Sequence, residues 1–268
     1  MDSAASLQRL DSILESMQSV AVAFSGGVDS TLLAHRAANI PGLTSRAVIV
    51  NSPFFTRDEL AEALALARKM GIDTVVKEID TMAAEVLANT AHRCYLCKMR
   101  VLSLIREAVP EGTVIVEGSN MDDLGDYRPG MKAVKDLGVR SPLIEAGFKK
   151  ADIRKHAEEL GLPNWDKPAA ACLATRIPTG EHIEPSVLRN IEAAEEFLKS
   201  RGIRHCRVRT HGQMARIEVA PEEREAFFDT DFMDETAAKL RELGFTFVSL
   251  DLAGYRRGNM NQNTTTLR

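Results

Sequence analysis

The chain has 268 residues and a formal net charge of -4, with 44% hydrophobic and 27% charged residues. This composition is ordinary for a globular protein with one large domain or two modest ones. The acidic balance argues against a nucleic-acid-binding protein, which usually carries a basic excess. No apolar run of about 18 residues and no signal-peptide pattern occurs, so we expect a cytoplasmic protein with no membrane or nucleic-acid partner.

Apolar runs alternate with amphipathic segments through the first part of the chain. The runs predict strands near residues 20–24, 45–52, 72–80 and 113–120. The amphipathic segments predict helices near residues 7–17, 30–40, 56–71, 98–112 and 149–163. In the third of these helices, Thr56 and Glu59 form a capping-box pattern. Because continuous apolar strands alternate with helices, we predict an α/β domain with a doubly wound, mostly parallel sheet over residues 1–179.

The pattern changes in the last third of the chain. We predict helices near residues 185–202 and 234–244, with strands around the His211-Gly212 pair and near residues 245–252. These elements predict a small α+β domain over residues 180–256, for substrate binding or oligomerisation. Residues 257–268 are polar, and we expect them to form a flexible tail.

The stretch SGGVDS ends the first predicted strand and opens a helix. Free N–H groups at a helix start favour an anion. Gly26 and Gly27 permit a close backbone approach, and Ser25, Ser30 and Thr31 add hydroxyl donors. The lysine of a Walker phosphate loop is absent, so a different phosphate loop is expected. The alternative interpretation is a tight turn that uses glycines for its geometry.

Polar segments follow other predicted strands as well. Asn51 follows the second strand, and Asp29 lies just inside the first helix after the SGG loop. The fourth strand is followed by Gly118, Ser119 and Asn120. Asp29, with Asp122 or Asp123, offers carboxylate oxygens to a magnesium ion that bridges phosphates. Ligands bind beyond the carboxyl ends of such strands, so we expect these segments to form one common site. The alternative for the segment after the fourth strand is an ordinary Asx turn.

Three of the four cysteines form a chemical pattern. Cys94 and Cys97 form a C-x-x-C pair, and Cys172 lies in the segment AACLATRIP. The pair brings two thiolates within reach of one metal or cluster, and Cys172 would supply a third ligand. A zinc site completed by His92 and a redox dithiol are the alternatives, and spacing alone does not choose among them.

The remaining candidate residues are three arginines and the fourth cysteine. Arg176 follows Cys172 closely, and we expect it to favour the thiolate. We interpret Cys206 as a small core residue. Arg207 and Arg209 alternate along a predicted strand and therefore share one face. Two guanidinium groups on one face suit a phosphate, although a solvated charged strand is the alternative.

The SGGVDS loop resembles the PP-loop of ATP pyrophosphatases, which cleave ATP between the α and β phosphates. Together with EGSNMDD, ACLATRIPTG and CRVRTHGQMARIEV, it resembles the LarE family of ATP-dependent sulfur insertases, over almost the whole chain up to about Tyr255. This resemblance implies that ATP adenylates a carboxylate of pyridinium-3,5-biscarboxylic acid mononucleotide. A sulfur then displaces AMP, and the product is the thiocarboxylate precursor of the nickel-pincer cofactor of lactate racemase.

The resemblance also implies roles for particular residues. The SGG loop and the segment after the fourth strand would bind ATP, with Mg²⁺ on Asp29 and Asp123. The substrate phosphate would bind Arg207 and Arg209, and Glu218 would be a further metal or substrate contact. We also expect a sulfide source and a homo-oligomer, a hexamer by resemblance.

Members of the family differ in their source of sulfur. Some sacrifice the sulfur of the cysteine that corresponds to Cys172 and keep a dehydroalanine. Others carry a C-x-x-C pair and resemble tRNA thiolases, in which a [4Fe-4S] cluster with an open iron delivers sulfide. Cys94, Cys97 and Cys172 match this second group, so we expect a [4Fe-4S] cluster. A tRNA thiolase, an ammonia-using amide synthetase and a non-enzymatic nucleotide or metal sensor are the competing functions.

Overall fold

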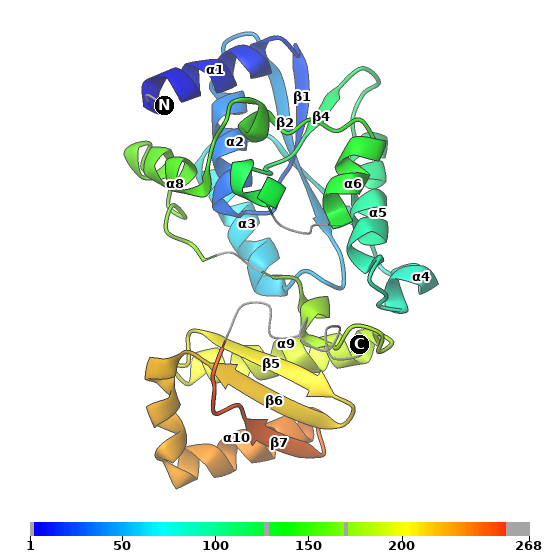
Figure 1. Ribbon diagram of the computed structural model, residues 1–268, viewed down its shortest axis with the longest axis vertical. Coiled ribbons are helices and arrows are strands. Elements are labelled where there is room, and N and C mark those ends of the chain that lie inside the picture. The colour runs from blue at the N-terminus through cyan, green and yellow to red at the C-terminus, as the bar shows by residue number, and fades with distance from the viewer. Residues whose placement is uncertain (1–2, 126–128, 169–170, 256–268) are drawn as a thin grey trace. The chain divides into compact units, whose positions relative to one another are not determined.

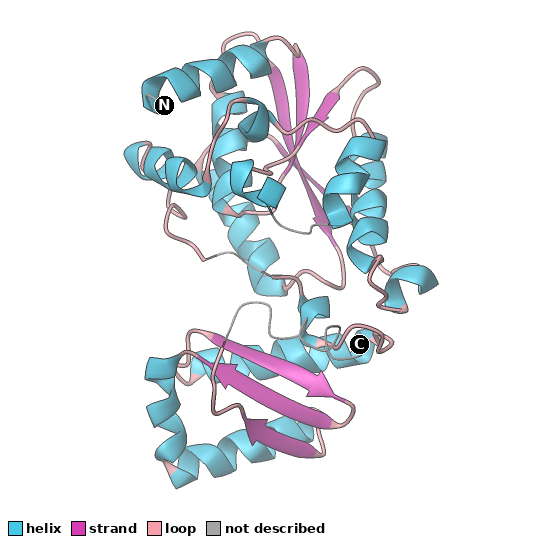
Figure 2. Ribbon diagram, viewed as in Figure 1, coloured by secondary structure: helices cyan, strands magenta, loops and turns pink. Residues whose placement is uncertain are grey.

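The computed structural model describes residues 3–125, 129–168 and 171–255. The chain divides into two compact units, each with its own sheet (Figure 2). Unit 1 comprises Met1–Met82 and His92–Ala170, and unit 2 comprises Ala83–Ala91 and Ala171–Arg268. No helix among the described residues has the length and apolar character needed to cross a bilayer.

The sheet of unit 1 is parallel throughout, as the apolar runs predict. Its strands are β1 (Ser19–Ala23), β2 (Thr44–Asn51), β3 (Thr74–Glu78) and β4 (Val114–Val116), in the order β3-β2-β1-β4. Successive residues of β1 point to opposite faces of the sheet. Val20 and Val22 pack into one apolar cluster and Ala21 into another, so both faces of the sheet are covered.

Helices lie on both faces of this sheet (Figure 1). One face is covered by α1 (Ser3–Glu15), α2 (Val28–Ala38), α3 (Arg57–Lys69), α7 (Pro142–Glu145) and α8 (Lys150–Glu159). The other face is covered by α5 (Arg93–Glu107) and α6 (Pro129–Asp136). The predicted capping box of α3 is present, with Thr56 Oγ1 accepting from Glu59 N at 3.1 Å and the Glu59 carboxylate accepting from Thr56 N at 3.0 Å. The predicted doubly wound α/β fold is therefore confirmed.

Unit 2 contains a three-stranded sheet backed by helices. Its strands are β5 (Cys206–His211), β6 (Met214–Val219) and β7 (Phe247–Leu250), in the order β5-β6-β7. The β5–β6 hairpin turns at Gly212, as predicted, whereas β7 runs parallel to β6. Its helices are α4 (Ala84–Leu87), α9 (Pro185–Ser200) and α10 (Thr230–Glu242), with short 3-10 helices η2 (Leu173–Arg176) and η3 (Pro221–Phe228).

The observed division differs from the predicted boundary after residue 179. The second unit begins at Ala171 and also takes in residues 83–91. The reason is a set of backbone hydrogen bonds between distant segments, such as Gly180 N to Asn89 O at 2.9 Å. Pairing of this kind carries no local sequence signal. The predicted tail, residues 257–268, lies outside the described residues.

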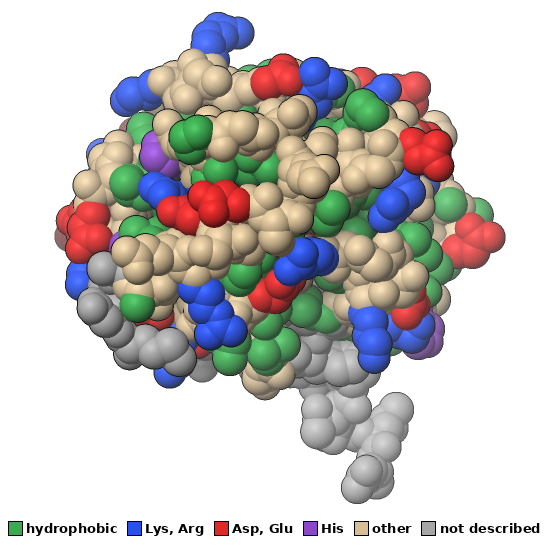
Figure 3. Space-filling view, turned by 90° about the horizontal axis from the view of Figure 1, so that it is seen from above, with side chains coloured by type: hydrophobic (Ala, Val, Ile, Leu, Met, Phe, Trp, Pro, Cys, Tyr) green, Lys and Arg blue, Asp and Glu red, His purple; other side chains and the backbone are tan. Residues whose placement is uncertain are grey.

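Both signs of charge appear on the surface. On the face shown in Figure 3, the described lysine and arginine side chains are interspersed with aspartate and glutamate. Hydrophobic side chains lie among them in small groups. This distribution agrees with a sequence of 34 basic and 38 acidic residues.

Candidate active site

A cavity of about 330 Å³ lies in unit 1 where β1 and β4 end. After β1 the chain continues into α2 on one face of the sheet, and after β4 it continues toward α6 on the other face. A point where the connections of neighbouring strands diverge in this way is the usual ligand position in an open α/β sheet. The polar side chains that line the cavity are Ser25, Asp29, Ser30, Lys98, Glu117, Ser119 and Asp123. The backbones of Gly27 and Gly118 line it as well. The SGG loop and the segment after the fourth strand therefore line one cavity, as their places at neighbouring strand ends predicted.

The SGG loop is held in shape by its own two serines. Ser25 N donates to Ser30 Oγ at 3.3 Å, and the two hydroxyl oxygens lie 3.2 Å apart. Ser30 Oγ donates in turn to the Gly27 carbonyl at 3.1 Å. No described side chain caps α2, so the N–H groups of its first turn remain available to an anion.

Gly26 and Thr31 support this loop from behind and do not line the cavity. Gly26 has φ +69°, and a Cβ there would lie 2.9 Å from Ala63 Cβ, so only glycine fits. The Asn164 Nδ2 group donates to the Gly26 carbonyl and to Thr31 Oγ1, both at 3.0 Å. Gly26 and Thr31 therefore contribute the shape of the loop and do not line the cavity themselves.

The turn after β4 packs directly on α2. A Cβ on Gly118 would lie 2.9 Å from the backbone nitrogen of Ser30. Asn120 faces inward, where its N–H donates to Asp123 Oδ2 at 3.0 Å and its side-chain oxygen accepts from Asp122 N at 3.0 Å. Asn120 thus shapes the turn, while the Asp123 carboxylate lines the cavity.

Glu117 organises this turn and was missed by the sequence analysis. Its carboxylate accepts from Ser119 N at 3.1 Å, from Ser119 Oγ at 2.8 Å and from Ser141 Oγ at 2.6 Å. Lys98 Nζ lies 3.4 Å from the same carboxylate. Only 4% of Glu117 is exposed. A charged residue that ends a buried strand was the available signal, since buried charges are normally paired.

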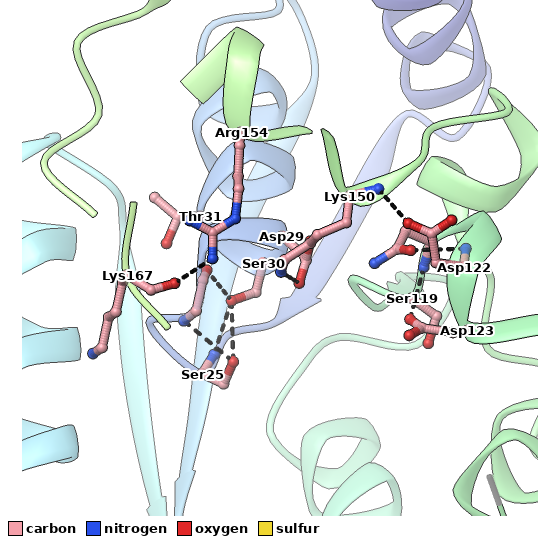
Figure 4. A network of polar contacts seen from close by, with 12 residues as sticks. Ser25, Asp29, Ser30, Thr31, Ser119, Asp122, Asp123, Lys150, Arg154 and Lys167 are labelled. Carbon is pink, nitrogen blue, oxygen red and sulfur yellow. Dashed lines mark hydrogen bonds and ion pairs between the residues drawn. The ribbon is translucent and has the colours of Figure 1, made fainter. Parts of the chain in front are cut away.

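Lys150 is a second residue that the sequence analysis missed. Its Nζ lies 2.5 Å from Asp29 Oδ2, and its backbone N–H donates to Asp122 Oδ2 at 2.8 Å (Figure 4). Asp29 Oδ1 is buried and accepts no hydrogen bond from the described residues. No local pattern marks Lys150, because its partner Asp29 is far away in the chain.

Asp29 and Asp123 suit a magnesium ion by their chemistry. Both carboxylates line the cavity, and Mg²⁺ is usually held by one or two protein carboxylates together with phosphate oxygens and water. The buried, unbonded Asp29 Oδ1 is an oxygen that a cation would satisfy. Asn51, by contrast, does not line this cavity, and its amide donates to Glu78 Oε2 at 2.7 Å.

The C-x-x-C pair lies in the first two turns of α5, which begins earlier than predicted. Cys94 is exposed and Cys97 is partly buried. Residues three apart on a helix share one face, so the two thiols can bind the same metal or cluster. Cys172 is exposed at the start of η2 in unit 2. Within the described ranges, no three His, Cys, Asp or Glu side chains gather in a group that could hold a metal.

Arg176, which we predicted to favour the Cys172 thiolate, contacts the backbone of the loop that carries this cysteine. The buried Arg176 guanidinium forms a two-point ion pair with Glu195, with both N–O distances 3.0 Å. It also donates to the carbonyls of Ala171 and Cys172. The ion pair with Glu195 holds the guanidinium in place, and its bonds to the two carbonyls then fix the backbone of the loop that carries Cys172.

Arginines gather on one face of the unit 2 sheet. β5 places Arg207 and Arg209 on the same face, as predicted, with Arg209 opposite Arg216 of β6. The fully buried Glu218 carboxylate lies 2.8 Å from both Arg209 and Arg216. Arg207 lies over the ring of Tyr255, 5.3 Å from its centroid. Glu218 therefore sits between two guanidinium groups, which fix the direction of its carboxylate.

Cys206 is a core residue, as predicted. Its side chain is buried among the apolar residues of unit 2. Burial, together with the nearby Glu195 carboxylate, raises the pKa of the Cys206 thiol to about 12. Cys206 is therefore not a thiolate near neutral pH.

Comparison with known proteins identifies the family. No family model matches the chain. A pyridinium-3,5-bisthiocarboxylic acid mononucleotide synthase of Lactiplantibacillus plantarum is 39% identical over 256 residues, 94% of this chain and 92% of that protein. An uncharacterized protein of Synechocystis sp. is 37% identical over 97% of this chain and 98% of its own. One from Methanocaldococcus jannaschii is 29% identical over 88% and 90%. The chain is therefore an enzyme of the LarE family, to which the bisthiocarboxylic acid mononucleotide synthase belongs.

Proposed function

We propose that this enzyme uses ATP to replace carboxylate oxygens of pyridinium-3,5-biscarboxylic acid mononucleotide with sulfur. The observation that carries the proposal is the 39% identity, over nearly the full length of both chains, to a synthase named for the bisthiocarboxylic product. The cavity beside the SGG loop supports the use of ATP. Two rounds of transfer would give the precursor of the nickel-pincer cofactor.

ATP would bind with its phosphates at the start of α2. The uncapped N–H groups of α2 and the hydroxyls of Ser25 and Ser30 are donors suited to pyrophosphate oxygens. Asp29 and Asp123 would hold Mg²⁺, which neutralises phosphate charge when it is bound. Lys98 adds a positive charge to the same cavity.

A carboxylate is a poor electrophile, which explains the need for ATP. A carboxylate oxygen of the substrate attacks the α-phosphorus, the bond to the β-phosphate breaks, and pyrophosphate leaves. Sulfur then attacks the acyl carbon, and the bond to AMP breaks. Donors fixed around the phosphates stabilise the leaving pyrophosphate without reorganisation.

We propose that Arg207 and Arg209 bind the substrate phosphate. Arginine forks match phosphate oxygens in geometry and charge. Arg207 rests on an aromatic ring and is the more accessible of the two, whereas only 5% of Arg209 is exposed. Glu218 would then orient Arg209 and contact neither metal nor substrate directly, because two guanidinium groups already surround it.

Sulfur would come from the exposed cysteines. Cys94, Cys97 and Cys172 are the residues that would hold a [4Fe-4S] cluster, which would supply replenishable sulfur when bound. Cys172 alone could instead attack the acyl-adenylate. Loss of its Cα proton and cleavage of its Cβ–S bond would then leave dehydroalanine and the thiocarboxylate.

An anaerobic assay with ATP, Mg²⁺, substrate and sulfide tests the proposal. Pyrophosphate, AMP and thiocarboxylate should form in equal amounts, and more than one sulfur should be transferred per chain. A stop at one sulfur, with dehydroalanine at position 172, would replace the cluster with sacrificial chemistry. Sulfur transfer to bulk tRNA with none to the mononucleotide would overturn the proposed substrate.

A further inference from the structure

Lys150 connects two segments that border the cavity of unit 1, the start of α2 and the turn after β4. Its ammonium pairs with Asp29, which follows β1, and its backbone N–H bonds to Asp122, which follows β4 (Figure 4). The N–H groups in the first turn of a helix have no acceptor within that helix. Lys150 is the first residue of α8, so its bond to Asp122 supplies an acceptor for one of these N–H groups. Lys150 therefore fixes both segments to the start of α8.

The contact divides the two oxygens of Asp29 between different tasks. Oδ2 is taken by Lys150 at 2.5 Å, whereas Oδ1 is buried with no hydrogen-bond donor among the described residues. Asp29 lines the cavity, and Lys150 is absent from its lining. A buried carboxylate oxygen without a donor is costly unless a ligand meets it. The ammonium thus holds the carboxylate from outside, and Oδ1 is the oxygen left for a ligand.

The ion pair also changes the charge of the site. An unpaired aspartate attracts any cation, through one oxygen or both. With a fixed ammonium on Oδ2, the pair is close to neutral, and a cation at Oδ1 is repelled by the ammonium. The pair therefore adds little attraction for a divalent cation beyond that of Asp123, and the cation binds well once phosphate oxygens supply further negative charge.

We infer that Lys150 is a positioning residue that makes metal binding at Asp29 depend on the nucleotide. It restricts Asp29 to one metal-binding oxygen and cancels its charge, so that the metal enters with the phosphates. The inference rests on the proposed function for the presence of ATP and Mg²⁺ in this cavity. By reciprocity, the metal raises ATP affinity by the same factor by which ATP raises metal affinity.

Binding measurements with Mn²⁺ as the probe test this role without any turnover. Free Mn²⁺ is titrated by electron paramagnetic resonance into the full-length protein, and ATP binding is measured with and without Mn²⁺. In Lys150→Gln, free Mn²⁺ should bind about tenfold more tightly, because the competing charge is gone. The factor by which ATP and Mn²⁺ strengthen each other's binding should fall about tenfold, and Lys150→Arg should restore most of it.

Lys167 provides a matched control. Its Nζ lies 2.6 Å from Glu62, a pair of similar length in the same unit, and neither residue lines this cavity. Lys167→Gln should keep the wild-type free-metal affinity and the wild-type coupling. Asp29→Asn in the Lys150→Gln background should remove the gained Mn²⁺ binding, which assigns that binding to Asp29.

Three results are decisive. Tighter free Mn²⁺ binding with weaker coupling in Lys150→Gln supports the inference. Unchanged free Mn²⁺ affinity and coupling, whether or not the melting temperature falls, would overturn it and leave Lys150 a structural ion pair. If the wild-type protein binds no ATP at all, the proposed function fails, while the free-metal comparison still decides whether Lys150 masks Asp29.

Discussion

The side-chain amide of Asn164 lies 3.0 Å from the carbonyl oxygen of Gly26, although 138 positions separate them in the chain. The same amide donates to the Thr31 hydroxyl at 3.0 Å, so both of its hydrogens are used. The loop that carries Asn164 is held by Arg154 of α8, which donates to the Lys167 carbonyl at 2.9 Å (Figure 4). The SGG loop is thus tied to a helix far along the chain.

Replacement of Asn164 by alanine should loosen the SGG loop. The change removes two hydrogen bonds and leaves two buried acceptors without this donor. The free energy of unfolding should fall by about 1–3 kcal/mol. ATP affinity should fall about tenfold, and calorimetric titration with denaturant unfolding checks both effects. Asn39→Ala, at an exposed amide near the end of α2, is the control. Wild-type ATP affinity in Asn164→Ala would contradict a supporting role.

A methyl group at Gly118 should separate the β4 turn from α2. The added Cβ would lie 2.9 Å from Ser30 N, and backbone on backbone has little room to relax. Gly118→Ala should weaken ATP binding at least about tenfold, since the Ser30 N–H lies in the proposed phosphate site. In Gly125→Ala the new Cβ meets no described atom within 4 Å, so ATP should bind normally. Equal affinities of the two variants would argue against phosphates at the start of α2.

Thiol labelling should separate Cys206 from the other cysteines. Burial and the pKa of about 12 keep the Cys206 thiol protonated and inaccessible near neutral pH. Brief iodoacetamide treatment of the metal-free folded protein should modify Cys94 and Cys172 and spare Cys206, as read by peptide mass spectrometry. Cys206→Ala should retain sulfur transfer, whereas Cys172→Ala should lose it. Labelling of Cys206 as fast as Cys172 in the folded protein would refute its burial.

Stability should fall as the solution becomes mildly acidic. Burial lowers the pKa of His35 and of His211 below the ordinary value of 6.5, with Arg36 and Arg216 adding to the effect. Below about pH 6.5 the unfolded chain therefore binds more protons than the folded protein. The contribution of these histidines to the free energy of unfolding is fully present above that pH and is lost as the pH falls toward the lowered pKa values. Urea unfolding between about pH 7.5 and 5.5 measures the slope.

Single substitutions assign this slope to its histidines. His35→Gln and His211→Gln should each flatten the dependence of the free energy of unfolding on pH. A slope unchanged in both His35→Gln and His211→Gln would show that neither histidine links stability to pH.

Local patterns in the sequence predicted much of the fold. The alternation of apolar runs and amphipathic segments gave the parallel sheet, and the Thr56–Glu59 spacing gave the start of α3. The SGGVDS stretch indicated a strand, a loop and a helix, because an apolar run ends at its glycines and a helical pattern follows them. Position along parallel strands then brought the SGG loop and the β4 turn to one cavity.

The features that the sequence did not predict depend on contacts between residues that lie far apart in the chain. Lys150 contacts the start of α2 and Asn164 contacts the SGG loop, each from more than a hundred positions away, and neither belongs to a motif. Arg176 pairs with Glu195 of α9, 19 positions further along the chain, and no local pattern marks that partner. The segment 83–91 joins unit 2 through backbone bonds that leave no trace in composition.

The most direct measurement follows the fate of ATP and sulfur together. The protein is purified anaerobically, supplied with sulfide, ATP, Mg²⁺ and pyridinium-3,5-biscarboxylic acid mononucleotide, and the products are identified by mass spectrometry. We predict thiocarboxylate product with AMP and pyrophosphate in equal amounts, and none of these in Asp29→Asn. Formation of ADP and phosphate, or pyrophosphate release with no sulfur in the mononucleotide, would contradict the proposed function.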